Sequence, residues 1–172
     1  MGYDKQIAGW DVEDAKEKKT EADDAVTEAK TKADTAKTNA EAAKANLKDA
    51  TNELKTATAE EKAADIALKK AKEAMKSTKK AMADTDGTAK YEAALAKGIL
   101  ARNDLKQKIK DHKDADKKVA DAKEKLKNRE AESKKADAEQ TAADKDLANK
   151  QAAAKTAEDA VTAAEAILKA IK

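Results

Sequence analysis

One acid and the single histidine of this 172-residue chain have side chains that could do chemistry together. Glu61 and His112 both stand at positions where a heptad pattern puts apolar residues. If two antiparallel helices pair positions whose numbers sum to 173, the carboxylate faces the imidazole. Because histidine changes charge at about pH 6.5, this pair could act as a pH-sensitive latch. We favour the simpler interpretation, a polar layer that sets the register of the two helices.

Other arrangements that support catalysis or ligand binding are missing from the sequence. One histidine and no cysteine make a poor set of metal ligands. No Gly-rich phosphate loop, no nucleophile with a nearby base and no pocket of paired carboxylates can be recognised. We therefore expect no enzymatic activity, no catalytic residue, no metal site and no cofactor.

The acid and the histidine belong to two stripes of mostly small apolar residues. The first stripe runs from Val12 to Met82 and the second from Tyr91 to Ile171, each in steps of three and four. These steps are typical of a helix whose a and d positions face a partner helix. With Val12 at position a, alanine occupies 17 of the 22 d positions from 15 to 171, although only 44 of the 172 residues are alanine. We call the a and d positions of both stripes the seam.

The composition agrees with long helices. Charged residues make up 42% of the chain, aromatic residues only 2%, and the mean hydropathy is −0.93. Such a profile is typical of coiled coils and also of disordered chains, but a disordered chain has no reason to keep one register over eleven heptads. The absence of proline also favours helix, since proline costs roughly 3 kcal/mol in a helix interior.

The pattern breaks once, at residues 84–88. Met82 and Tyr91 are nine residues apart instead of seven, and Asp86-Gly87 is a turn signal. We therefore predict an all-α fold, a single elongated antiparallel two-helix hairpin over 1–172, with helices at about 5–83 and 89–171 and a turn at 84–88. This alanine-rich coiled coil could pair into a four-helix assembly. The simplest register puts Met75 opposite Gly98, and a shift by half a heptad is the alternative.

Several large apolar residues fall outside the seam. A two-helix hairpin would leave them in water, and clusters of exposed apolar side chains often mark contacts. One cluster lies near the start of the chain and the other on both sides of the break. As candidate self-association patches we predict Tyr3, Ile7, Trp10, Ile66, Leu95, Ile99, Leu100 and Ile109.

Charge is distributed unevenly along the chain. Residues 1–28 carry a net charge of −5 and residues 102–135 a net charge of +5, so a staggered neighbour could pair the two segments. The total of +2, with acids beside most bases, argues against nucleic-acid binding. Lys108, Arg129 and Lys150 interrupt the alanine series at d, either with their stems over the seam or as docking points for carboxylates.

Nothing in the sequence predicts membrane insertion or export. No apolar run approaches the roughly 20 residues of a membrane span, and the first residues are too polar for a signal peptide. The sequence is compatible both with a cytoplasmic protein and with a mature exported one.

In composition the chain is similar to the late-embryogenesis-abundant proteins, and the stretch Thr38-Asn39-Ala40-Glu41-Ala42-Ala43-Lys44 looks like a fragment of their repeats. That resemblance implies a stress protectant or a helix that acts on surfaces. Those proteins repeat every eleven residues, however, whereas this chain keeps a period of seven. A bacterial cell-envelope stalk is a further alternative. Our leading hypothesis is a non-enzymatic structural protein, a coiled-coil rod that binds copies of itself and assembles into a filament or scaffold.

Overall fold

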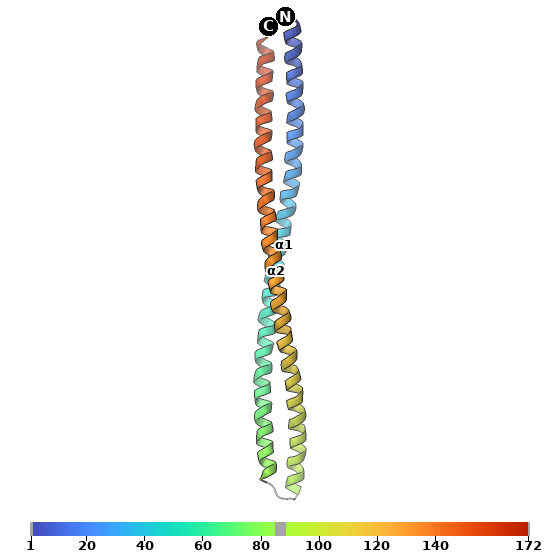
Figure 1. Ribbon diagram of the computed structural model, residues 1–172, viewed down its shortest axis with the longest axis vertical. Helices are drawn as coiled ribbons and strands as arrows, with labels where there is room; N and C mark the ends of the chain where they lie inside the picture. The colour runs from blue at the N-terminus through green and yellow to red at the C-terminus, as the bar shows by residue number, and fades with distance from the viewer. Residues whose placement is uncertain (1, 85–88, 172) are drawn as a thin grey trace. The chain divides into compact units, whose positions relative to one another are not determined.

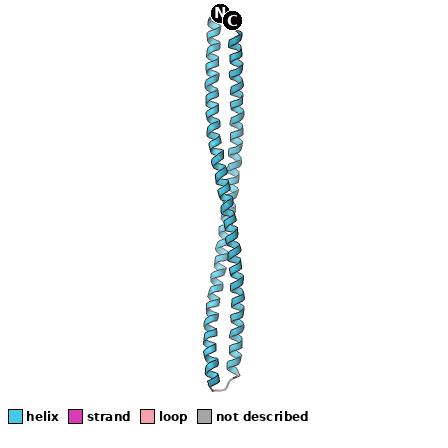
Figure 2. Ribbon diagram, turned by 180° about the vertical axis from the view of Figure 1, so that it is seen from behind, coloured by secondary structure: helices cyan, strands magenta, loops and turns pink. Residues whose placement is uncertain are grey.

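The computed structural model describes residues 2–84 and 89–171, nearly all of them helical (Figures 1 and 2). Helix α1 (Gly2–Ala83) and helix α2 (Ala89–Ala170) each contain 82 residues. The two helices pack against each other in a hairpin, and no strand occurs in the described part of the chain. The predicted all-α hairpin is thus confirmed, with α1 starting at Gly2 instead of near residue 5. Asp84 ends α1 by donating its backbone N–H to the Lys80 carbonyl at 3.1 Å, while the rest of the predicted turn, 85–88, lies outside the described residues.

Local interactions explain why such polar segments remain helical. Alanine has the highest helix propensity of all residues. The threonines, which are poorer helix formers, donate their hydroxyls to the carbonyl oxygen four residues earlier at 2.8–3.1 Å, as Thr35 does to Thr31. Lysines and aspartates four residues apart add ion pairs along the helices, among them Lys18–Asp14 and Lys19–Asp23, both at 2.6 Å.

The structure divides into two units, which we describe separately. Unit 1 comprises Met1–Ala45 and Ala131–Lys172. The start of α1 and the end of α2 lie side by side in it (Figure 1). Lys16 pairs with Glu165 at 3.1 Å and Lys44 with Asp137 at 2.9 Å, and all four residues occupy e positions. Residues that are buried in unit 1 all belong to the seam: Ala8, Val12, Ala29, Ala33, Ala40 and Ser133.

Unit 2 comprises Asn46–Glu130. Here the ion pairs between the helices join g positions, Glu60 with Lys118 at 2.8 Å and Glu53 with Lys125 at 2.6 Å. In an antiparallel coiled coil, e positions of one helix lie beside e positions of the other, and g positions lie beside g positions. The observed ion pairs follow this rule. The buried residues again belong to the seam: Ala50, Ala57, Ala71, Ala94, Gly98, Ala115, Val119 and Ala122.

The layers of unit 2 correct the simplest register. Ala57, Val119 and Ala122 form one buried cluster against which Leu54 packs, so residues from a and d positions pack together. Opposite Gly98, Met82 and Thr78 supply the nearest side-chain atoms, where Met75 was expected. Side chains from two successive seam positions, d and a, thus fill the space over the glycine. The predicted a-with-a pairing of Met75 and Gly98 is wrong.

Candidate functional site

The structure brings His112 into contact with carboxylates from both helices of unit 2. Its Nε2 atom lies 3.7 Å from Oδ1 of Asp65 on α1, and its Nδ1 atom lies 3.1 Å from Oδ2 of Asp116, one turn along α2. The imidazole is about three-quarters buried, with 26% of its side chain exposed, whereas Asp65 is half-buried and Asp116 is exposed. A protonated imidazole here would form an ion pair within α2 and another between the helices.

Glu61, the predicted partner of His112, lies at the same place in the fold but is not the acid in contact with it. Glu61 and His112 line one surface hollow together with Lys62 and Asp65. Asp65 follows Glu61 by one helical turn and reaches the imidazole from an e position. The sequence contained a signal for this, since a residue at e flanks the seam and can fold over it. The role of Glu61 and His112 in setting the register stays a prediction.

Lys69 places a positive charge beside Asp65. Its ammonium donates a hydrogen bond of 2.7 Å to Asp65, one turn earlier on α1. That hydrogen bond is the main cause that lowers the pKa of the Asp65 carboxyl below its ordinary value of 3.8, and the charges of Lys69 and His112 act in the same direction. Asp65 therefore remains a carboxylate beside the imidazole over an extended pH range.

The contacts around His112 are electrostatic, joining the imidazole to Asp65 and Asp116. Within residues 2–84 and 89–171, no group of three or more His, Cys, Asp or Glu side chains is arranged to hold a metal ion. A larger surface hollow of unit 2 is lined by Glu53, Glu60, Lys118 and Lys125, whose charges are already paired across the helices.

The candidate self-association residues are exposed wherever their side chains are described. Trp10 on α1 is 60% exposed and Leu100 on α2 is 69% exposed. Tyr3 belongs to α1, but its side chain lies outside the described residues. The other predicted residues are also exposed: Ile7, Ile66, Leu95, Ile99 and Ile109. The role of these residues in association stays a prediction.

Sequence reasoning missed two exposed apolar side chains. Ile167 falls at a g position of α2 and is 60% exposed. Tyr91 was assigned to the seam, yet 39% of it is exposed because it is the first a residue after the break. The heptad position of Ile167 was a sufficient signal, whereas the exposure of Tyr91 depends on how the end of the hairpin packs.

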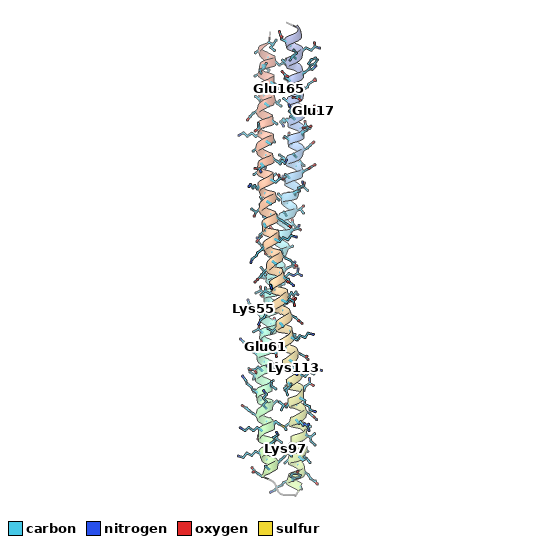
Figure 3. All side chains as sticks on the ribbon, viewed as in Figure 1. Glu17, Lys55, Glu61, Lys97, Lys113 and Glu165 are labelled. Atoms are coloured by element: carbon cyan, nitrogen blue, oxygen red, sulfur yellow. The ribbon has the colours of Figure 1, made fainter. Side chains whose placement is uncertain are left out.

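The three cations at d positions differ in burial. Lys108 is half-buried and contacts Asp111 at 3.4 Å, and Arg129 is half-buried as well. Both interpretations of these cations, stems over the seam or docking points for carboxylates, stay predictions. Lys150 is exposed. Most charged side chains of both helices project into solvent (Figure 3).

Among the helices that the structure describes, none has a segment long and apolar enough to cross a membrane. The chain matches no protein-family model, no curated protein and no solved structure.

Proposed function

We propose that this protein is a non-enzymatic structural protein, a coiled-coil scaffold that binds copies of itself and assembles into a filament. The observation that carries the proposal is that large apolar side chains are exposed outside a seam whose fully buried residues are small. The described buried residues are almost all alanine, with Val12 and Val119 the largest apolar ones. In contrast, the only tryptophan and five of the six isoleucines are exposed.

The energetics of the seam support this proposal. Burial of apolar surface contributes roughly 25 cal/mol per Å², so an alanine layer contributes little and stability must accumulate over many heptads. Large apolar side chains that remain in water would gain more from a second surface. Single exposed apolar residues are normal, but groups of them are common at protein–protein contacts.

Self-association should be measured as the mass of the protein over a hundredfold range of concentration, by light scattering coupled to size-exclusion chromatography. We expect the mass to grow with concentration. The double variant Ile7→Ser/Trp10→Ser should shift this growth to higher concentration, because two exposed apolar side chains are removed. The matched control is Thr31→Ser/Thr35→Ser, which changes two exposed residues of the same helix.

Two results would contradict the proposal. If the measured mass is that of one chain at every concentration, the protein does not self-associate and the proposal is wrong. A circular dichroism spectrum of a mostly disordered chain in dilute buffer would instead favour the stress protectant that the composition resembles.

A further inference from the structure

A second stripe, on the outer face of α1 in unit 1, is apolar at its start and then acidic. Its members recur in steps of three and four, so they share one face of the helix, and it lies away from the seam at positions c and f. All of them are exposed. We call this the acidic stripe, and its residues are Ile7, Trp10, Asp14, Glu17, Glu21 and Asp24.

A stripe with the opposite charge lies on α2 in unit 2. Its members occupy positions b and e, recur in steps of four and three, and are all exposed. The stripe also starts with two apolar residues and contains no acid. We call this the basic stripe, and its residues are Leu95, Ile99, Arg102, Lys106, Ile109 and Lys113. Glu17 and Lys113, one from each stripe, are labelled in Figure 3.

The charges of both stripes are mostly available for a partner. In the acidic stripe only Asp14 has an ion pair within the described residues, with Lys18 of the same helix. Among the described side chains, Arg102, Lys106 and Lys113 form no ion pair at all. The ion pairs that join the two helices of each unit use other residues, at the flanks of the seam.

We infer that the acidic stripe of one copy binds the basic stripe of a second copy, with the two helices parallel. Aligned from their first residues, the stripes place Ile7 beside Leu95 and Trp10 beside Ile99. The same alignment then places Asp14 beside Arg102, Glu17 beside Lys106 and Asp24 beside Lys113. Only Glu21, beside Ile109, lacks a complementary neighbour. The antiparallel alignment is poorer, since Ile7 would face Lys113 and Asp24 would face Leu95.

The observations favour a second copy over other occupants because both complementary surfaces occur in the same chain. The stripes match in length, spanning 7–24 and 95–113, and in the order of apolar and charged residues. Since the two stripes are different surfaces, each copy could bind one neighbour through each of them. When a copy makes its two contacts with different neighbours, such heterologous contacts need not close into a ring and can extend into a filament. This inference rests on the proposed function and names the surfaces that would carry it.

Reciprocal charge reversal tests the inference. The acid-reversed variant is Glu17→Lys/Asp24→Lys, and the base-reversed variant is Lys106→Glu/Lys113→Glu. Each variant alone turns the Glu17–Lys106 and Asp24–Lys113 pairs from attractive to repulsive, so its association should weaken about tenfold or more. Mixed in equal amounts, the two variants are complementary at both contacts and should associate nearly as well as the original chain.

The control variant Lys110→Glu/Lys117→Glu makes the same change in net charge at exposed f positions of α2. It should associate within about threefold of the original chain, because its positions lie outside the basic stripe. Circular dichroism should show that all variants remain helical. The orientation is tested separately by disulfide formation between single-cysteine copies, which Ile7→Cys should give with Leu95→Cys and not with Lys113→Cys.

The outcomes separate this inference from the proposed function. If the original chain associates and both reversed variants associate equally well, the stripes are not the contact, although the scaffold remains. If the original chain never associates, the proposed function fails and the inference fails with it. If phosphatidylserine vesicles bind the original chain but not the base-reversed variant, and mixing the variants restores no association, the basic stripe binds a lipid surface and the inference is overturned.

Discussion

At the scale of single residues, Gly9 and Gly98 differ in what surrounds them. A Cβ atom at Gly98 would lie 2.8 Å from Sδ of Met82 and 3.6 Å from Cγ2 of Thr78, whereas nothing lies within 4 Å of one at Gly9. Gly98 is therefore a place where the opposite helix approaches closely, and Gly9 is merely a weak point of the helix.

Alanine substitutions should separate these two situations. Gly9→Ala is expected to raise the free energy of unfolding by about 0.5–1 kcal/mol through helix propensity alone. Gly98→Ala should raise the free energy of unfolding by about 1 kcal/mol less than Gly9→Ala does, because the added methyl group displaces the Met82 side chain. Urea unfolding followed by circular dichroism measures both values. Equal gains at the two positions would show that Met82 does not occupy the space over Gly98.

The charges around His112 predict that the stability of the folded chain falls at low pH. The pKa of Asp65 is lowered in the folded chain, chiefly by the hydrogen bond from Lys69, so folding favours the carboxylate. This contribution is fully present above the ordinary value of 3.8 and is lost as the pH falls through the lower folded pKa. Between pH 7 and pH 2.5, Asp65→Asn should lose less stability than the original chain. Asp34→Asn, at an exposed position, is the control and should follow the original chain.

At the scale of the helices, the size of an apolar side chain is a poor guide to its contribution. Val119 is buried with Ala57 and Ala122 in unit 2, whereas the larger Ile66 of the same unit is 54% exposed. The position within the heptad decides the difference, since Val119 stands at a and Ile66 at f. Larger side chains of the seam, such as Leu54, are only half-buried.

Truncation of Val119 and of Ile66 to alanine tests whether the heptad position decides the contribution of each side chain. Val119→Ala should lower the free energy of unfolding by about 2 kcal/mol, because it removes two buried methyl groups and leaves a cavity. Ile66→Ala removes more atoms but should change stability by less than about 0.5 kcal/mol in the dissociated protein. The measurement is urea unfolding at a low protein concentration. A larger loss for Ile66→Ala than for Val119→Ala would place Ile66 in the hydrophobic core.

At the scale of the whole molecule, the chain separates the surfaces that hold its helices together from those proposed to join copies. The helices are joined by the seam and by ion pairs such as Glu60–Lys118 and Lys16–Glu165. The acidic and basic stripes use none of these residues. Changes to the stripes should therefore alter association with little effect on folding, which is the reason that charge reversal can test the contact without unfolding the protein.

The sequence by itself determined the helices, the break between them and the membership of the seam. The bounds predicted from Met82, Tyr91 and the turn signal agree with α1 and α2 within a few residues, and every described buried residue stands at a or d. These features follow from helix propensity and from a period that each helix carries in its own residues. Local information of this kind needs no tertiary contacts.

Only the tertiary structure decided which residues share a layer. Several registers satisfy the same alanine seam, because neighbouring layers of small side chains are nearly equivalent in shape. The structure places Met82 and not Met75 over Gly98, and Asp65 and not Glu61 in contact with His112. Which of these residues come into contact depends on how far one helix is displaced along the other. That displacement is set by the summed energies of all the layers.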